Sequence, residues 1–463
     1  MATYDAIIIG TGQSGPALAR RLVGSGMQVA IVERGRFGGT CVNTGCTPTK
    51  TLVASAYAAH VARRGADYGF SAGEVRIDMQ RVKARKDYVV GLSNQGVERS
   101  LKTLENCRVY EGHARFVSAR EVEVGTEVLT AERIFINVGG RAAVPTIPGL
   151  DQVDYLTNSS MMDVDFLPPH LLVLGGSYIG LEFGQMYRRF GSEVTIIELG
   201  PRLTAREDED VSDAIAGFLT KEGIAIRVNA NCLRVRKQGS DIVMTVDCDG
   251  TSEIRGSHLL LATGRRPNTD DLGLERAGVQ QDARGYITVD DELRTNVPGI
   301  WALGDCNGRG AFTHTSWNDY EIVAANLLDG ERRRVSDRIT AYALYTDPPL
   351  GRAGMSEAEV RKSGRRALLG KIAMEDVSRA FEKGETEGFM KVLIDADTKE
   401  ILGASFLGLN CDEVIHCVLD VMYAKAPYTV MERAMHIHPT VAEFIPSLLG
   451  DLAPLPALMK RPV

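Results

Sequence analysis

The stretch YDAIIIGTGQSGPALARRLVGSGMQVAIVE, residues 4–33, decides the fold of this 463-residue chain. An apolar run leads into Gly10, Gly12 and Gly15, and an amphipathic helical pattern and a second apolar run follow. The glycines let a strand turn sharply into a helix, so that a pyrophosphate can bind the free N–H groups at the helix N-terminus. Glu33 ends the second run, where an acid can accept hydrogen bonds from a ribose. The stretch therefore predicts a dinucleotide-binding βαβ unit.

A second stretch, HLLVLGGSYIGLEFGQMYRRFGSEVTIIE at 170–198, repeats this pattern 165 residues further on. The positions that match at this one offset are Gly175, Gly180, Gly191 and Glu198. Ser177 stands where the first unit has Gly12, which weakens the second fingerprint. Two such units predict an α/β protein with two Rossmann-like domains. They also suggest two cofactors, a resident flavin and a diffusing nicotinamide nucleotide.

The composition is that of an ordinary globular protein, with 44% hydrophobic and 24% charged residues. The formal net charge of −7 gives no basic surface for nucleic acid or an acidic membrane. No apolar run approaches the ~20 residues that span a bilayer. The opening YDAIIIG is too short for a signal peptide. We therefore expect a cytoplasmic protein that binds neither nucleic acid nor membrane.

The chain has eight cysteines, too few for a secreted disulfide scaffold. Six are scattered and are interpreted as small buried hydrophobic residues: Cys107, Cys232, Cys248, Cys306, Cys411 and Cys417. Cys411 and Cys417 share NCDEVIHC with His416, but no second ligand cluster accompanies them to complete a metal site. Only Cys41 and Cys46 form a close pair in unusual surroundings.

That pair lies in GGTCVNTGCTPTK, residues 38–50. Zinc normally takes four ligands from two such pairs, and only one is present, so a metal site is disfavoured. Pro48 suits the first turn of a helix, and helical periodicity follows it. Cys46 is then expected near a helix N-terminus beside Lys50, and both features favour the thiolate. We interpret Cys41 and Cys46 as a pair that opens and closes during a redox reaction.

Two further features concern the cofactors. GIWALGDCNGRG, residues 299–310, predicts a strand that ends at Asp305, an acid that can bind the ribityl chain of a flavin. A helix is expected to start at Thr313 and to direct its N-terminus at the flavin ring. Glu198 favours NADH over NADPH because an acid accepts ribose hydroxyls and repels a 2′-phosphate. Arg202 and Arg206 follow closely and are the residues that would admit NADPH.

The cysteine motif, both fingerprints, ATGRRPNT (262–269), GIWALGD and HIHPTVAE (436–443) occur in a characteristic order. In this order they resemble the class I pyridine nucleotide–disulfide oxidoreductases, which include lipoamide dehydrogenase, glutathione reductase and mercuric reductase. The resemblance covers essentially the whole chain. The segment YTDPPLGRAGMSEAEVRKSG (345–364) is most similar to the mercuric-reductase-like branch.

The resemblance implies a role for each residue near the flavin. Cys46 matches the charge-transfer cysteine that faces the flavin, and Cys41 matches the interchange cysteine that meets substrate. Lys50 matches the lysine near flavin N5, and Glu182 matches its ion-pair partner. Tyr178 matches the aromatic gate over the nicotinamide pocket. The motifs also contain the remaining candidate cofactor-binding residues, Gly39, Thr40 and Gly264.

His438 and Glu443 match the acid–base pair that one subunit of a dimer supplies to the other. His436 is expected to have no role. The resemblance therefore implies a homodimer held together by a C-terminal α+β domain. Mercuric reductases also carry a C-terminal cysteine pair, whereas GDLAPLPALMKRPV (450–463) contains none, so efficient handling of Hg(II) is not expected.

The expected domains follow the motifs along the chain. They are an FAD-binding domain at 1–150, an NAD(P)-binding domain at 151–268, a segment completing the FAD domain at 269–338, and a dimerisation domain at 339–463. The implied activity passes electrons from NADH or NADPH through FAD and the cysteine pair to a disulfide or metal-ion acceptor. The alternatives are dihydrolipoamide dehydrogenase, a mercuric reductase without the C-terminal cysteines, a flavin transhydrogenase or oxidase, and a non-catalytic redox sensor.

Overall fold

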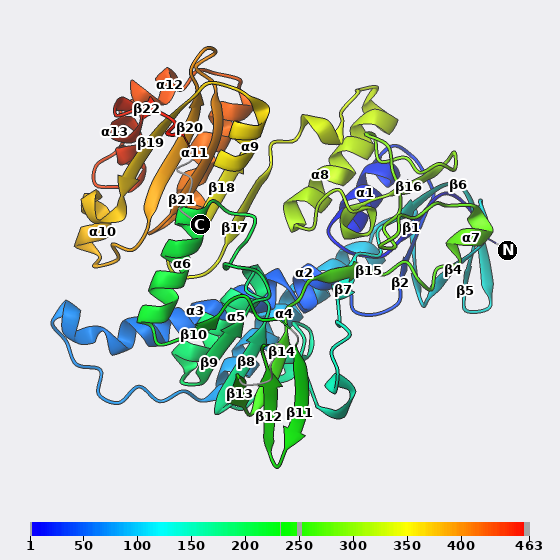
Figure 1. Ribbon diagram of the computed structural model, residues 1–463. Helices are drawn as coiled ribbons and strands as arrows, with labels where there is room; N and C mark the ends of the chain where they lie inside the picture. Colours follow the sequence, from blue (N-terminus) through cyan, green and yellow to red (C-terminus); the bar gives the residue numbers. More distant parts are fainter. Residues whose placement is uncertain (1, 232, 248–251, 458–463) are drawn as a thin grey trace.

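The computed structural model describes residues 2–231, 233–247 and 252–457 (Figure 1). Cys232 and Cys248, two of the cysteines expected to be buried, lie outside the described residues. Within the described chain, the strands form three larger sheets with helical cover, one three-stranded meander and one pair of short connecting strands. No helix of this part of the chain is both long and apolar enough to cross a lipid bilayer.

The first sheet is built around the N-terminal stretch, with strand order β3-β2-β1-β6-β5-β4 and β16 paired to β6. Its strands are β1 (Ala2–Ile9), β2 (Val29–Glu33), β3 (Cys107–Glu111), β4 (Ala114–Ser118), β5 (Glu121–Val124), β6 (Glu127–Ile136) and β16 (Ile300–Ala302). Strands β3, β2, β1, β6 and β16 run parallel, whereas β4 and β5 form an antiparallel extension. Ile7 and Ile9 enter the core on one face and Ile8 enters the core on the other, because successive strand residues alternate.

Helices cover this sheet and extend from it toward the second unit. They are α1 (Ser14–Gly24), α2 (Gly39–Asn43), α3 (Cys46–Arg63), α4 (Met79–Lys102), α7 (Leu274–Ala277) and α8 (Thr313–Ala324). Helices α1 and α8 pack against each other, and α3 packs against both α4 and a helix of the second unit. Strand β16 and helix α8 join the first sheet although they follow the second unit in sequence (Figure 1).

The second sheet repeats the parallel βαβ arrangement, with strand order β10-β9-β8-β14. Its elements are β8 (His170–Leu174), α5 (Tyr178–Phe190), β9 (Glu193–Ile197), α6 (Glu209–Lys221), β10 (Ala225–Arg227) and β14 (His258–Leu261). An antiparallel meander of β11 (Arg234–Gln238), β12 (Asp241–Thr245) and β13 (Glu253–Gly256) lies beside it. The chain enters and leaves this unit through β7 (Gly140–Ala142) and β15 (Arg265–Pro267), which pair with each other.

The third sheet is C-terminal, with strand order β17-β18-β21-β20-β19-β22 and antiparallel pairing throughout. Its strands are β17 (Ala341–Leu344), β18 (Leu350–Gly354), β19 (Ala367–Ala373), β20 (Phe389–Asp395), β21 (Ile401–Leu407) and β22 (Ala453–Pro454). Its helices are α9 (Glu357–Ser363), α10 (Ser378–Glu382), α11 (Cys411–Tyr423), α12 (Thr429–Glu432) and α13 (Ile445–Gly450). The predicted fold class, two Rossmann-like units and a C-terminal α+β domain, is confirmed.

Candidate functional site

The glycines of both fingerprints are required by the fold itself. Gly10 has φ +105° and Gly175 has φ +119°, values that side chains rarely permit. A Cβ built on either would lie 2.3 or 2.4 Å from a carbonyl oxygen at the end of the neighbouring strand. A Cβ on Gly15 or Gly180 would lie 2.3 or 2.0 Å from the carbonyl oxygen of Gly10 or Gly175. Each strand therefore turns into its helix with backbone atoms in close contact.

The serine that departs from the second fingerprint fits without strain. At Gly12, its counterpart, a built Cβ would come no closer than 3.4 Å to a protein atom, which is ordinary van der Waals contact. Ser177 precedes α5 with φ −114°, an extended conformation open to any residue. The turn thus has room for a small side chain at this position, and the missing glycine does not weaken the second unit's geometry.

Each unit holds its acid in the same way. Glu33 accepts hydrogen bonds from the backbone N–H of Thr11 at 3.0 Å and of the residue two positions after itself at 2.8 Å. Glu198 accepts the equivalent bonds at 2.6 and 2.8 Å. Helices α1 and α5 begin without a side-chain cap, so their first-turn N–H groups are available to an anion. Both units therefore fit a dinucleotide, with its pyrophosphate at the helix and its ribose at the acid.

One cavity of about 2150 Å³ joins the two units to the cysteine pair and to α11 of the C-terminal domain. The predicted site residues that line it are Gly10, Gly12, Glu33, Gly39, Thr40, Cys41, Cys46, Lys50, Gly175, Tyr178, Glu182, Glu198, Gly264, Asp305 and Thr313. Gly15 and Gly180 lie behind the turns and do not line it. His438 and Glu443 also lie outside the cavity wall.

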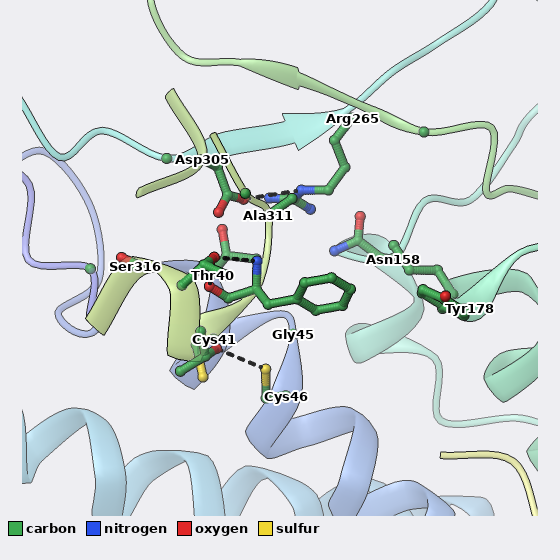
Figure 2. Close-up of a pocket in the computed structure, with 18 of the residues that line it drawn as sticks. Thr40, Cys41, Gly45, Cys46, Asn158, Tyr178, Arg265, Asp305, Ala311 and Ser316 are labelled. Atoms are coloured by element: carbon green, nitrogen blue, oxygen red, sulfur yellow. Dashed lines mark hydrogen bonds and ion pairs between the residues drawn. The ribbon is translucent and has the colours of Figure 1, made fainter. Parts of the chain in front are cut away.

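The two cysteines come from consecutive short elements that fold back on each other. Cys41 lies in α2, and α3 begins at Cys46, at the helix start that the sequence predicts. Gly45 permits the bend between them, since a Cβ there would lie 2.9 Å from the carbonyl oxygen of Thr40. Neither cysteine forms a disulfide in this structure (Figure 2). Cys46 Sγ lies 3.2 Å from Oγ1 of Thr313, the first residue of α8, so the N-termini of α3 and α8 converge on one sulfur.

The two sulfurs share one proton unequally. The pKa of Cys46 is lowered to about 6, chiefly by a hydrogen bond from the Cys41 thiol and also by Thr313 and the Lys50 charge, which together outweigh the opposing effect of burial. The same hydrogen bond and burial raise the pKa of Cys41 well above its usual range. At neutral pH Cys46 is therefore the thiolate and Cys41 is the thiol that donates to it.

Replacing Thr313 with valine is expected to raise the pKa of Cys46 by about one unit. A hydrogen bond to a charged acceptor contributes roughly 1.5–3 kcal/mol, and one pKa unit corresponds to about 1.4 kcal/mol. Titrating the ultraviolet thiolate absorbance of the reduced protein measures the shift. Thr51→Val, which removes a hydroxyl bonded to the Thr47 carbonyl at 2.8 Å, serves as the control. An unchanged midpoint in Thr313→Val would contradict the assignment.

An ion pair connects the cysteine helix to the second unit. Lys50 Nζ lies 2.6 Å from Glu182 Oε2, and Glu182 is only 6% exposed. The other Glu182 oxygen accepts the backbone N–H of Tyr345 at 3.1 Å, and Lys50 Nζ lies 4.5 Å from the centroid of the Tyr345 ring. The Lys50 ammonium is therefore held beside the cysteine pair by contacts with α5 and with the C-terminal domain.

On the first unit's side, Asp305 follows β16 and lines the cavity. Burial raises the pKa of Asp305, and the Arg265 guanidinium at 3.5 Å opposes this rise. Figure 2 shows this pair across the cavity from Cys41 and Cys46. Gly264, just before Arg265, has φ +120°, so the connector that carries Arg265 turns tightly. Asp305 can therefore accept hydrogen bonds from the hydroxyl groups of a ligand that runs from the first fingerprint toward the cysteines.

His438 and Glu443 pair with each other but stand apart from the cysteines. His438 Nδ1 lies 2.9 Å from Glu443 Oε2 in the segment between α12 and α13. The His438 side chain is 75% exposed in the single chain. The assignment of this pair to a second subunit stays a prediction.

The sequence did not identify several aromatic and acidic residues of the cavity region. Phe312, Tyr342 and Tyr345 line the cavity, and the Phe312 and Tyr342 rings stack at 5.4 Å. The buried acid Glu207 bonds Tyr178 and Tyr342. No local pattern distinguishes these residues, because their neighbours come from segments far apart in the chain.

Comparison with known proteins agrees with the geometry. The family model for pyridine nucleotide-disulphide oxidoreductases matches residues 4–319, and the model for the dimerisation domain of the same family matches residues 340–448. The probable pyridine nucleotide-disulfide oxidoreductase RclA of Escherichia coli is 35% identical, with 97% of this chain and 99% of RclA covered. A mercuric reductase of Streptomyces lividans is 36% identical, with 95% and 94% covered.

A dihydrolipoyl dehydrogenase of Cupriavidus necator is 33% identical over 95% of this chain and 96% of its own length. Among solved structures, the Cu(II) complex of the HOCl-induced flavoprotein disulfide reductase RclA from Escherichia coli superposes with a TM-score of 0.89. That pair is 34% identical, and 97% of this chain and 99% of the other are covered. The chain therefore belongs to the pyridine nucleotide-disulphide oxidoreductase family.

Proposed function

We propose that this protein passes electrons from NADH or NADPH, through FAD and the Cys41–Cys46 pair, to a disulfide or a metal ion. The observation that carries the proposal is the single cavity that joins two dinucleotide turns to a thiol–thiolate pair. A flavin transhydrogenase or oxidase has no use for that pair. A non-catalytic redox sensor has no use for the second dinucleotide unit.

A flavin held along the first dinucleotide turn, Asp305 and the cysteine pair, with a reduced nicotinamide held at the second turn, would supply the two electrons that open the Cys41–Cys46 disulfide. The protein then holds one proton on Cys41 and one negative charge on Cys46, stabilised by Thr313 and Lys50. Cys41 loses its proton and attacks an acceptor disulfide, which releases one acceptor thiol. The Cys46 thiolate next attacks Cys41 in the mixed disulfide, re-forms the bridge and releases the second thiol.

A base is required to take the proton from Cys41 and return it to the leaving thiolate. His438, paired with Glu443, has the chemistry for this role. Since neither residue lines its own chain's cavity, the role requires a second copy, and the protein acts as a homodimer. The match to the family's dimerisation domain and the relatives support this arrangement.

Two acceptor classes follow from the site and the relatives. The His438–Glu443 pair suits a disulfide acceptor, because the leaving thiolates need protons. A metal acceptor is favoured by the relatives, which include a mercuric reductase and a structure described as a Cu(II) complex. In the metal reaction a Cys41–Cys46 dithiolate binds the ion and gives it two electrons, or gives one electron to each of two ions, as the disulfide re-forms.

Steady-state assays of the purified protein with NADH test both classes side by side. The acceptors are lipoamide, glutathione disulfide, Cu(II) and Hg(II), and an artificial dye reports electron flow through the flavin alone. Turnover of at least one biological acceptor, lost on alkylation of the reduced cysteines, is expected. A protein that reduces only the dye, with or without alkylation, would contradict the proposed function.

Glu198 is expected to make NADH the better nucleotide, so the KM for NADPH exceeds the KM for NADH. Both Glu198 and Arg206 line the cavity, whereas Arg202 donates to backbone carbonyls of its own loop. Glu198→Gln is expected to lower the ratio of the KM for NADPH to the KM for NADH roughly tenfold. The substitution removes a repulsion of about 1–4 kcal/mol between the Glu198 carboxylate and the 2′-phosphate at contact distance. Steady-state KM measurements provide the test.

Glu193→Gln, at the exposed start of β9, the strand that Glu198 follows, is the matched control for that substitution. It changes the net charge by the same amount but lies outside the cavity wall. An equal fall of the ratio in both variants would mean that overall charge, and not the Glu198 carboxylate, sets the preference.

A further inference from the structure

A fully buried carboxylate lies beneath the tyrosine that stands at the second fingerprint. Glu207 has no exposed side-chain surface. Its Oε1 accepts the phenol of Tyr178 at 3.0 Å and the phenol of Tyr342 at 2.6 Å. Burial first, and then the Glu207 charge, raise the pKa of Tyr178 above its usual range. The Tyr178 phenol therefore stays protonated and acts as a donor to Glu207.

Tyr178 stands at the second dinucleotide turn, and its ring neighbours an aromatic residue that is adjacent in sequence to the Thr313 beside Cys46. Tyr178 is the first residue of α5 and lines the cavity. Its ring centroid lies 6.2 Å from that of Phe312 and 5.5 Å from that of Tyr342. Phe312 directly precedes Thr313, whose hydroxyl contacts Cys46. A nicotinamide that approaches from the second unit therefore meets the Tyr178 ring before it reaches the redox centre.

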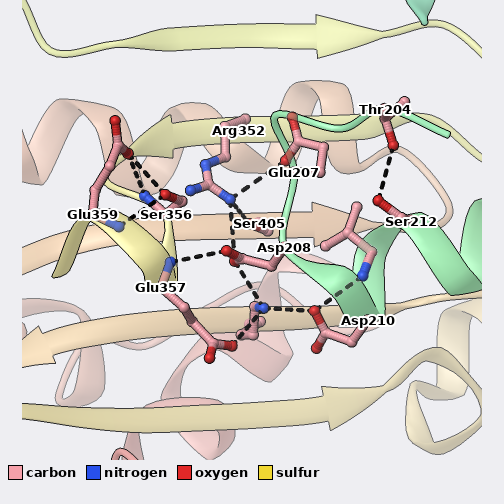
Figure 3. Close-up of polar contacts among 12 residues, drawn as sticks. Thr204, Glu207, Asp208, Asp210, Ser212, Arg352, Ser356, Glu357, Glu359 and Ser405 are labelled. Atoms are coloured by element: carbon pink, nitrogen blue, oxygen red, sulfur yellow. Dashed lines mark hydrogen bonds and ion pairs between the residues drawn. The ribbon is translucent and has the colours of Figure 1, made fainter. Parts of the chain in front are cut away.

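Glu207 itself is held in place by the C-terminal sheet (Figure 3). Arg352 of β18, 3% exposed, lies 3.4 Å from Glu207 Oε2 and 3.4 Å from Asp208 Oδ2. The same guanidinium bonds the Ser405 hydroxyl of β21. Lys391 of β20 lies 2.9 Å from Asp208. The carboxylate is therefore a fixed acceptor, and the tyrosine ring is the partner that can move away from it.

The neighbouring acids do not call for a metal ion. Oxygens of Asp208, Asp210 and Glu357 lie within 4.8 Å of one another, a spacing compatible with a cation. The Lys391 ammonium already contacts all three, at 2.9, 2.7 and 2.8 Å. Lys391 thus supplies the positive charge, and this cluster acts as the rigid support beneath Glu207.

We propose that Glu207 is a positioning residue that latches the Tyr178 ring over the redox centre and thereby sets the affinity for the nicotinamide. The inference rests on the proposed function. Nicotinamide entry breaks the Tyr178–Glu207 hydrogen bond, while Tyr342 and Arg352 keep the carboxylate paired. The cost of breaking that bond lowers the apparent affinity for any ligand that must displace the ring.

Substitutions at Tyr178 and Tyr342 are expected to change the affinity for the nicotinamide in opposite directions. Both phenols donate to the same oxygen of Glu207, so each weakens the other's bond. Tyr178→Phe removes the bond that closes the gate and makes nicotinamide entry easier. Tyr342→Phe leaves Tyr178 as the single phenol donor on that oxygen and makes entry harder. The two chemically identical substitutions, 5.5 Å apart between ring centroids, act in opposite directions.

The experiment is rapid-mixing reduction of the flavin-loaded protein by NADH, which gives an apparent Kd and a limiting rate. Tyr178→Phe is expected to lower the Kd about tenfold, the scale of a hydrogen bond to a buried charge, and Tyr342→Phe to raise it several-fold. The limiting rate stays within about twofold. Binding of ADP-ribose, which carries no nicotinamide and need not displace the ring, stays unchanged in both variants.

Glu207→Gln tests whether the Glu207 carboxylate acts through the Tyr178 ring. It is expected to lower the Kd for NADH several-fold in the wild-type background and to have no further effect in a Tyr178→Phe background. Tyr57→Phe, which breaks a 2.8 Å phenol–carboxylate bond to Glu385, is the control and leaves the Kd unchanged. If Glu207→Gln fails to fold, the opposite signs of the two Tyr→Phe variants still decide the proposal.

Three results would overturn the latch. These are an unchanged Kd in Tyr178→Phe, shifts of the same sign in both tyrosine variants, and an equal effect of Glu207→Gln in both backgrounds. A wild-type protein whose flavin is reduced by neither NADH nor NADPH would overturn the proposed function, and the latch with it. If the wild-type flavin is reduced normally and the variants have the same Kd as the wild type, the latch is refuted and the proposed function stands.

Discussion

A Cys41→Ser protein is expected to reduce its bound flavin with NADH as fast as the wild type, yet to lose turnover with a disulfide or metal acceptor by roughly 10³-fold or more. The hydride step needs the two dinucleotide units, and neither uses the Cys41 sulfur. The onward step needs a sulfur that can form and break a bond with the acceptor, which a serine hydroxyl cannot do. Rapid-mixing flavin reduction and steady-state acceptor turnover measure the two halves separately.

The Cys41→Ser variant also tests what sets the pKa of Cys46. The Cys41 thiol makes the largest contribution to lowering the pKa of Cys46 to about 6. A serine hydroxyl at position 41 can still donate, so Cys46 is expected to keep a pKa below its ordinary value and its thiolate above about pH 6. As the pH falls through that value the thiolate is lost. Cys417→Ser, half-buried on α11, is the control and leaves both activities intact. Undiminished acceptor turnover in Cys41→Ser would refute the role of the pair.

The dinucleotide units were predictable because their determinants are local. Glycine is required at positions 10 and 175 because a Cβ there would lie 2.3–2.4 Å from a carbonyl oxygen. The same geometry recurs at one fixed offset in sequence. The helix start at Cys46 was predictable for the same reason, since Pro48 and the helical periodicity lie within a few residues of it. A short-range steric or capping requirement leaves its signature in a short stretch of sequence.

Glu207 could not be found in this way. It lies in the run REDED at 206–210, which has the composition of a solvated helix start, and α6 does begin at Glu209. Its burial comes from β17 and β18, more than 130 residues later in the chain. The sequence also could not place His438. Its pairing with Glu443 is local, but in the proposed homodimer the groups that face its exposed ring belong to a second chain.

The polar side chains of α5 show how these long-range contacts act together. Tyr178, Glu182, Gln185 and Arg189 recur at intervals of three or four residues, so they share one face of the helix. Tyr178 reaches Glu207, Glu182 reaches Lys50, and Gln185 and Arg189 reach Asp347 at 2.7 and 2.6 Å. One face of a nucleotide-unit helix is therefore tied to both the cysteine helix and the C-terminal domain. A displacement of α5 would therefore disturb contacts with both the cysteine helix and the C-terminal domain.

A His438→Ala protein is expected to lose about 10²–10⁴-fold of its turnover with a disulfide acceptor, the usual contribution of a positioned acid–base group, while flavin reduction by NADH is unaffected. His436→Ala is the matched control. His436 is two residues away and half-buried, and its ring nitrogen Nδ1 lies 3.1 Å from the Ala434 carbonyl oxygen of its own loop. It is expected to retain wild-type turnover. Equal losses in the two variants would indicate damage to the loop and not the removal of a proton carrier.

Mixed dimers decide which chain each histidine serves. Random reassembly of equal amounts of Cys41→Ser and His438→Ala subunits gives about half hybrid dimers, because a two-fold dimer pairs its chains statistically. If His438 serves the partner's cysteines, each hybrid has one site with both residues intact, and the mixture regains about a quarter of wild-type turnover. If His438 serves its own chain, every site lacks one of the two groups and no turnover returns. A mixture as inactive as its two parents would therefore contradict the shared site, and with it the need for a homodimer.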